Sequence, residues 1–213
     1  MLRTRQRGIS LVEIAIGLAI LGISFSWAIP SYSRWIQNTK IRNMAESLVN
    51  GLQLARSEAI GRNSQVQFIL TDSNAGSAAE DTDLATLGNE TGTNWMVRAI
   101  LPPAAGLPDY AYVSGSVGAE GSDNATVQAG DMAIGGSVNA ITFNGFGRLL
   151  TVNDDVSGPI RKICIRSSRL SFAQGARILE IDIGTAGQIK MCDPSVSSPT
   201  DTRRCISPAP RCA

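Results

Sequence analysis

One acidic residue, Glu13, lies inside the longest apolar stretch of the chain, which runs from Ile9 to Ile29. About 20 apolar residues are enough to cross a bilayer as a helix, so this length predicts a membrane-spanning segment. A carboxylate in hydrocarbon costs on the order of 2.5–3.5 kcal/mol, and proteins keep such a group when it has a partner. Because Arg3, Arg5 and Arg7 precede the stretch, we expect a cytoplasmic N-terminus and a head across the membrane.

The composition excludes several kinds of catalytic and metal site. The 213 residues contain no histidine, so a histidine general base, a Ser-His-Asp triad and histidine metal ligands are ruled out. No Gly-rich phosphate loop and no G-x-S-x-G motif occurs. The net charge of +1 gives no bulk attraction to nucleic acid. We therefore expect a protein that is not an enzyme and that uses no cofactor or metal.

The four cysteines all lie in the last quarter of the chain, at Cys164, Cys192, Cys205 and Cys212. A four-thiolate zinc site normally has closely paired ligands, and no C-x-x-C pair is present. In an exported domain two disulfides are the better interpretation. Three connectivities are open, and we favour Cys192–Cys205, which would tie down the C-terminal tail.

The pattern after the apolar stretch predicts that its helix continues. Apolar residues recur every three or four positions from Ile41 to Ala59, which is typical of an amphipathic helix that packs on a sheet. We expect Pro30 to bend this helix and Gly61 to end it. One helix is thus predicted over Ile9–Ile60, with a first half that contacts lipid or other subunits.

The rest of the chain, residues 63–213, has the pattern of a glycine-rich β head. Two stretches rich in small and polar residues, Asp72–Gly92 and Gly115–Gly136, are interpreted as loops. The expected strands are Gln65–Thr71, Trp95–Leu101, Tyr110–Val113, Ala140–Phe143 with Arg148–Val152, Arg161–Arg166, Arg177–Ile183 and Gln188–Cys192.

The run Arg7-Gly8-Ile9-Ser10-Leu11-Val12-Glu13 resembles the class III signal of type IV prepilins, with isoleucine where that family usually has phenylalanine. The resemblance implies that residues 1–8 form a leader, that prepilin peptidase cuts between Gly8 and Ile9, and that Ile9 is N-methylated. It also implies a kinking proline at Pro30. Glu13 becomes the fifth mature residue, and in a filament it would pair with the α-amine of Ile9 in a neighbouring subunit.

A second resemblance covers most of the chain. Leu52–Ile60 with Arg62-Asn63 is similar to the signature of FimT/FimU-type minor pilins and GspH-type pseudopilins, and Ile141–Arg148 and Gly187–Cys192 resemble two later motifs of that family. The implied fold is α+β and type IV pilin-like. Residues 9–30 form a transmembrane and filament-core helix, residues 31–62 form its amphipathic half, and this half packs on a head of two antiparallel β-sheets.

The function that this resemblance implies is that of a minor pilin, a structural and priming subunit of a type IV pilus that can lie at its tip. Its partners would be other major and minor pilins, prepilin peptidase and the inner-membrane assembly platform. The chain would begin as a single-pass inner-membrane protein with a periplasmic head. The alternative from the same architecture is a GspH-like pseudopilin of type II secretion.

A third function, DNA binding for natural transformation, is implied because some FimT-like minor pilins bind DNA through basic residues near the C-terminus. The candidates here are Lys190, Arg203, Arg204 and Arg211. The family's G-R-x-R run reads Gly187-Gln-Ile-Lys190, so one arginine is lost and the other is lysine. The tail also lacks aromatic residues that could stack on bases. A solvent-facing polar tail is the competing interpretation.

Overall fold

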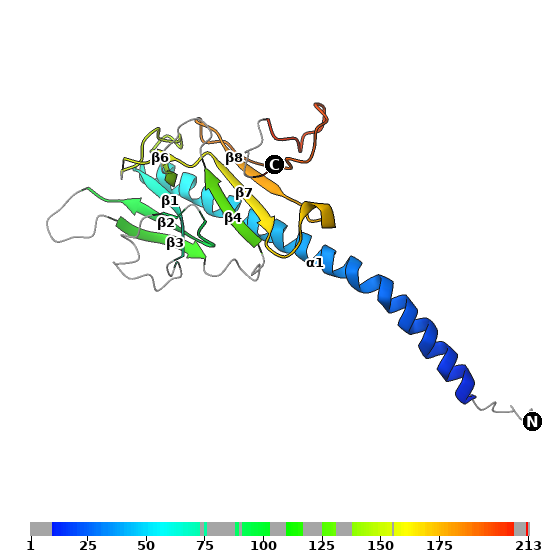
Figure 1. Ribbon diagram of the computed structural model, residues 1–213. Helices are drawn as coiled ribbons and strands as arrows, with labels where there is room; N and C mark the ends of the chain where they lie inside the picture. The colour runs from blue at the N-terminus through cyan, green and yellow to red at the C-terminus, as the bar shows by residue number, and fades with distance from the viewer. Residues whose placement is uncertain are drawn as a thin grey trace, which may run out of the picture. The chain divides into compact units, whose positions relative to one another are not determined.

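A 52-residue helix, α1, runs from Leu11 to Arg62 and belongs to both units into which the chain divides, Met1–Ile36 and Gln37–Ala213 (Figure 1). The computed structural model describes residues 10–72, 75, 88–89, 91–102, 110–116, 125–130, 138–154, 156–206 and 212. In the first unit the structure describes Ser10 and the N-terminal part of α1, and the second holds the rest of α1 and all the described strands.

The first unit is a helix without a polar face. Its large apolar side chains from Leu11 to Phe25 are each between 53% and 84% exposed, so nothing in the unit covers them. Among the described residues, no helix is both long enough and apolar enough to cross a membrane. The expected membrane segment, residues 9–30, includes Ile9, which lies outside the described residues, and it stays a prediction.

In the second unit, the remaining part of α1 buries one face. The apolar positions picked out by their spacing are all at most 1% exposed, namely Ile41, Met44, Ala45, Leu48, Leu52, Ala55 and Ala59. The helix was expected to end at Ile60, before Gly61, but α1 runs two residues further, to Arg62. Asn63 follows with a φ of 49°, and asparagine is one of the few residues that adopts this left-handed conformation readily.

The described strands form two sheets on which this part of α1 packs (Figure 1). One sheet has the order β3-β2-β1-β5-β6 and is antiparallel except for the short parallel pair β5–β6. Its strands are β1 (Val66–Thr71), β2 (Asn94–Ile100), β3 (Tyr110–Ser116), β5 (Val138–Phe143) and β6 (Gly158–Pro159).

The other sheet is antiparallel throughout and has the order β4-β7-β8-β9. Its strands are β4 (Ala125–Gly130), β7 (Lys162–Ser167), β8 (Leu179–Ile183) and β9 (Ile189–Cys192), and a short 3-10 helix, η2 (Phe172–Gln174), lies between β7 and β8. One buried cluster joins apolar side chains from α1 and both sheets. The expected α+β architecture is confirmed.

Two details of the strand prediction are wrong. The stretch Gly115–Gly136, expected to be a loop, contains the end of β3 and all of β4. The expected strand Arg148–Val152 is reduced to one isolated bridge between Phe143 and Leu149. Strand β4 pairs with β7 along its whole length, and backbone pairing of this kind depends on the partner strand more than on the residues of the strand itself.

Candidate functional site

The start of α1 gives Glu13 a local partner that was not expected from the sequence. The carbonyl of Ser10 accepts hydrogen bonds from the N–H groups of Glu13 and Ile14 at 3.1 and 3.2 Å, which makes Ser10 the N-cap. The N–H of Ser10 donates to Oε2 of Glu13 over a long 3.5 Å. Ser10 and Glu13 have the spacing of a capping box, a sequence signal that could have revealed this contact.

Three of the predicted residues in this region remain untested. Gly8 and Ile9, the expected cleavage and methylation positions, lie outside the described residues. Pro30 lies within α1, whose helical backbone continues past it, and the expected kink stays a prediction.

The three stretches that carry the second resemblance meet at one place in the head. Arg56, from the helical stretch, donates from Nε to the carbonyl of Gly147 at 3.2 Å. A Cβ added to Gly187 would lie 1.9 Å from that same carbonyl oxygen and 3.1 Å from Nε of Arg56. Gly147 and Gly187 both have left-handed φ values, of 69° and 83°. The shared motifs therefore hold the helix end, one turn and the start of β9 in close contact.

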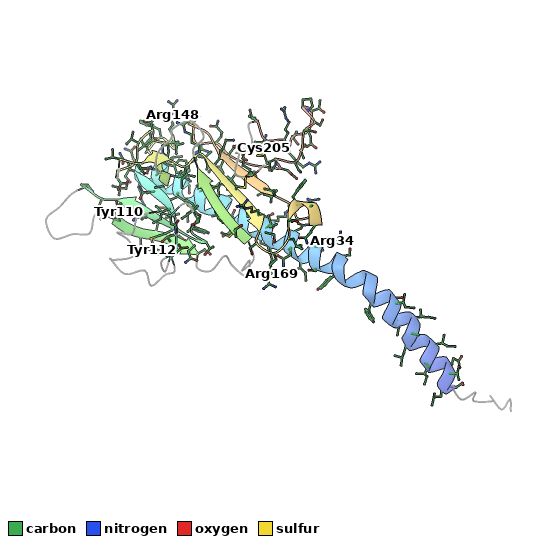
Figure 2. The ribbon with its side chains drawn as sticks, in the orientation of Figure 1. Arg34, Tyr110, Tyr112, Arg148, Arg169 and Cys205 are labelled. Carbon is green, nitrogen blue, oxygen red and sulfur yellow. A yellow bond between two sulfur atoms is a disulfide. The ribbon has the colours of Figure 1, made fainter. Side chains whose placement is uncertain are left out.

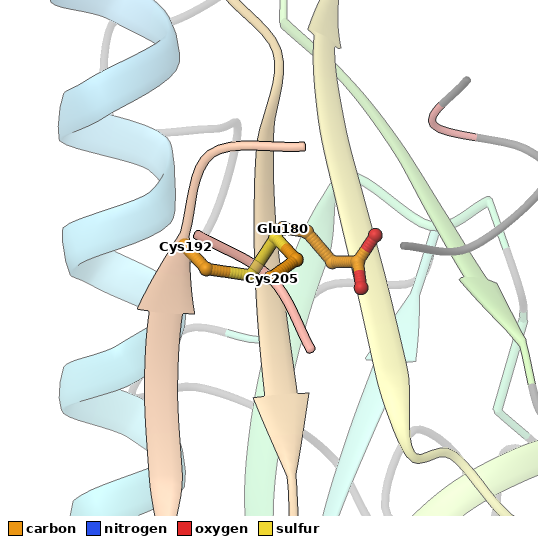
Figure 3. Close-up of side chains that lie close together, drawn as sticks. All are labelled: Glu180, Cys192 and Cys205. Atoms are coloured by element: carbon orange, nitrogen blue, oxygen red, sulfur yellow. A yellow bond between two sulfur atoms is a disulfide. The ribbon is translucent and has the colours of Figure 1, made fainter. Parts of the chain in front are cut away.

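The four cysteines form two disulfides, Cys192–Cys205 and Cys164–Cys212. The first is the pairing that the sequence analysis favoured. Glu180 lies close to the Cys192–Cys205 pair, and the three residues together resemble a metal-binding cluster (Figure 3). The sulfur atoms are bonded to each other, however, so they are not thiolates available to a metal.

Glu180 instead belongs to a charge cluster with Lys162 and Asp182. Nζ of Lys162 donates to Oε1 of Glu180 and to Oδ1 of Asp182, each at 2.9 Å, and the Glu180 side chain is fully buried. Burial by itself lowers the pKa of Lys162, but the hydrogen bonds to the two carboxylates outweigh it and raise the pKa above its ordinary value. The cluster links β7 to β8 and accounts for the buried acid.

Of the C-terminal cations that were candidates for DNA contact, Lys190, Arg203 and Arg204 lie in the described part of the chain. Arg203 donates from Nε and Nη2 to the carboxylate of Asp201, at 3.1 and 2.8 Å, and this pairing lowers the pKa of Asp201 to about 2. Lys190 lies beside Arg204 and donates from Nζ to its carbonyl at 3.4 Å. Arg211 lies outside the described residues. Arg203 is thus already neutralised within the tail.

A basic groove elsewhere on the head was not foreseen. It has a volume of about 750 Å³ and lies between the end of β7, η2, residues 176–178 just before β8 and the segment after β9. Three arginines line it, Arg166, Arg169 and Arg177, and Figure 2 shows Arg169 on the surface. The sequence does hold a signal for it, because residues 161–179 contain five cations and no acid. We call this feature the arginine groove.

Comparison with known proteins places the chain in a family. Residues 44–187 match the family described as Type II transport protein GspH, and residues 3–29 match the prokaryotic N-terminal methylation motif. No curated protein sequence matches.

Two solved structures of the type IV minor pilin FimU from Pseudomonas aeruginosa are similar at 18% identity. One has a TM-score of 0.46 and covers 78% of this chain and 97% of that chain. The other has a TM-score of 0.42 and covers 74% and 97%. Because the family match spans more than half of the sequence, the chain belongs to the GspH family and is a type IV pilin-like minor pilin or pseudopilin with an N-terminal methylation motif.

Proposed function

We propose that this protein is a minor pilin, a structural and assembly-priming subunit of a type IV pilus. The observation that carries the proposal is the uncovered apolar surface of α1 from Leu11 to Phe25. A helix that is apolar all round needs a membrane or other apolar helices around it. The inner membrane covers the segment before assembly, and the same segments of other major and minor pilins cover it in the filament.

The N-terminus is processed before assembly. Prepilin peptidase cuts between Gly8 and Ile9 and methylates Ile9, and the methylation-motif match over residues 3–29 supports this step. Mass spectrometry of the membrane-extracted protein should show a chain that begins at Ile9 and carries one methyl group. A chain that still begins at Met1 would contradict the proposal.

In the filament, Glu13 pairs with the α-amine of a neighbour's Ile9. The local contact from Ser10 is long, at 3.5 Å, and supplies no positive charge. Cleavage creates a free amine, and in an apolar bundle each of the two opposite charges needs the other. The pair also fixes the axial offset between subunits, because it forms at one register only.

A gene deletion tests the assembly role. Deletion should remove most surface pili without removing the major pilin from the membrane, and the wild-type gene should restore them. Immunogold labelling of the restored pili should mark their tips. Normal piliation in the deletion strain would end the priming role, and uniform labelling along the filaments would end the tip position.

A second candidate is a minor pseudopilin of type II secretion, which the description of the matched family favours. The same deletion separates the two candidates. Loss of pili with normal secretion of extracellular enzymes supports the pilus, and the opposite result assigns the chain to secretion.

DNA binding is the third candidate, and the structure leaves it the least support. Of the four basic residues that suggested it, Arg203 is neutralised by Asp201, and Lys190 and Arg204 alone remain as exposed cations in the described part of the tail. Each phosphate contact adds to affinity and to its salt dependence, so two cations give weak binding. A mobility shift at low salt that is lost in Lys190→Glu with Arg204→Glu would revive this function.

A further inference from the structure

The arginine groove carries positive charge, and its three arginines are exposed. Arg166, Arg169 and Arg177 line it, and no aspartate or glutamate is among the lining residues that the structure describes. Within the described part of the chain, the side chains of Arg169 and Arg177 are exposed and have no ion-pair partner. Asp193 directly precedes the lining residue Pro194, and its Oδ1 accepts from the N–H and the hydroxyl of Ser195, so one acid lies beside a groove that three arginines line. The groove is therefore suited to an anion.

The walls of the groove are held in place before any ligand arrives. The Cys164–Cys212 disulfide ties the C-terminal end of the chain to β7. Asn38, on α1, donates from Nδ2 to the carbonyl of Gly175 at 3.3 Å, and its Oδ1 accepts from the N–H of Arg177 at 2.8 Å. A site held in this way loses little conformational entropy when it binds.

An exposed aromatic ring stands at the same place. Phe172, in η2, is 63% exposed although it lines the groove. Ser167, Ser168, Ser171 and Ser195 add hydroxyl groups to the lining. Arginines that bind phosphate, with an apolar ring beside them that can enter the acyl boundary, are the combination found on protein surfaces that lie in the membrane interface.

We propose that the arginine groove binds the anionic headgroups of the membrane in which the subunit waits before assembly. This inference rests on the proposed function, because it takes Ile9–Ile29 to be the membrane anchor. Asn38, which clamps the groove, is nine positions after Ile29 in the sequence. Nine residues span at most about 30 Å even when fully extended, so the length of chain between the anchor and Asn38 is short enough for the groove to reach the bilayer surface.

The bound headgroup holds the head against the bilayer and is released when the subunit is drawn into the filament. A lipid phosphate is favoured over a DNA phosphate by the exposed Phe172 and by the membrane tether. Duplex DNA, whose bases are already stacked on one another, would gain only the charge contacts, and the groove offers three arginines in one spot, not a line of cations that follows a strand.

The test uses the full chain in lipid nanodiscs and measures hydrogen exchange over residues 166–177. One set of discs contains phosphatidylcholine alone, and the other contains equal parts of phosphatidylcholine and phosphatidylglycerol. We expect slower exchange in the phosphatidylglycerol discs and loss of this protection at high salt.

Arg169→Gln with Arg177→Gln is the variant that reports on the groove. Each arginine near an anionic surface contributes a factor of about five to binding, so the double variant should lose most of the protection. Arg148→Gln is the matched control, because Arg148 is also exposed but lies at the other end of the head from Arg169 (Figure 2). It should keep the protection in full.

Equal exchange in the two sets of discs would overturn the inference and leave the proposed function intact. Protection by a short DNA duplex added to phosphatidylcholine discs, without protection by phosphatidylglycerol, would assign the groove to DNA. Failure of the chain to enter the discs would overturn both the inference and the membrane anchor. Processing at Ile9 and piliation are measured separately, so the failure of one claim is distinguishable from the failure of the other.

Discussion

The two halves of α1 solve the burial of apolar residues in opposite ways. Between Ile41 and Ala59, seven apolar residues at helical spacing lie on one face, and the sheets of the same chain cover them to 1% exposure or less. From Leu11 to Phe25 the apolar residues surround the helix and stay more than half exposed. The helix is continuous in both, so the difference comes from the side-chain pattern and not from the backbone.

Because of this difference, we expect the second half of α1 to determine stability and the first half to determine assembly. The second half contributes to a core that the head completes by itself, and its substitutions should change the free energy of unfolding. The large apolar side chains of the first half are exposed, so their substitutions should change what the chain associates with. Matched substitutions in the two halves, or in the head alone, can therefore separate an effect on stability from an effect on association.

The largest effect is expected at Glu13. Glu13→Gln keeps an oxygen that can accept from Ser10 but removes the negative charge, so we expect normal cleavage after Gly8 and no entry into the filament. The matched control is Glu46→Gln on the second half of α1, where the exposed ion pair with Arg42 contributes only about 0.3–0.5 kcal/mol. Immunoblots of sheared pili measure both variants. Wild-type amounts of the Glu13→Gln protein in pili would contradict the pairing.

The disulfides should stabilise the head and leave the first half of α1 unaffected. Cys192 and Cys205 are 13 positions apart, and Cys164 and Cys212 are 48 apart. In the chain-entropy account, replacing each pair by serine costs about 3 and about 4 kcal/mol, respectively. Denaturant unfolding of the full chain in detergent checks the two losses. The account fails if replacing Cys192 and Cys205 lowers the free energy of unfolding more than replacing Cys164 and Cys212 does.

Gly187→Ala should destabilise the head by about 1–3 kcal/mol, because its backbone is left-handed and the new Cβ would meet the carbonyl oxygen of Gly147. Gly61→Ala is the control within α1, where nothing lies within 4 Å of an added Cβ. The control should stabilise the head by about 0.4–1 kcal/mol. Thermal unfolding of both variants measures these changes. A Gly187→Ala head that is as stable as the wild type would show that the three motifs do not meet as described.

A smaller effect on the stability of the head is expected when the pH is changed. The pKa of Lys162 is raised above 10.5 in the folded head, so its contribution to stability is fully present below that pH and is lost as the pH rises through the folded value. The pKa of Asp201 is lowered to about 2 from 3.8, so its contribution is present above 3.8 and is lost as the pH falls toward 2. Because Asp201 pairs with an exposed Arg203, the acid effect should be the smaller.

Lys162→Met tests the alkaline part of this profile. In the wild-type protein the free energy of unfolding should fall as the pH rises above 10.5, and in the variant this fall should be smaller. An unchanged slope of stability against pH would assign the alkaline loss to other groups.

The sequence was informative wherever the side-chain pattern decides the structure. The spacing from Ile41 to Ala59 predicted the buried face of α1, because only one face of a helix can pack on a sheet. Strand β4 was missed because only Thr126 and Val127 of its six residues favour strands, and its pairing with β7 decides its structure. The end of α1 was misplaced because Gly61 is an obvious stop signal, whereas Asn63 adopts the left-handed turn.

The candidate sites show the same limit. Glu13 could be singled out, since an acid in an apolar run needs an explanation from the sequence alone. The arginine groove could not be assembled in advance, because η2, Asn38 and a disulfide bring together residues that share no motif. Asp201 was close enough to Arg203 in the sequence to offset part of its charge, and the structure adds the two hydrogen bonds that join them.

Sedimentation of two proteins side by side tests the contrast between the halves most directly. One is the processed chain from Ile9, and the other is the second unit alone, Gln37–Ala213. After removal of detergent, the account predicts a folded monomer for the second unit and association of the processed chain through its uncovered helix. A processed chain that stays monomeric, or a second unit that unfolds or associates to the same extent, would contradict the account.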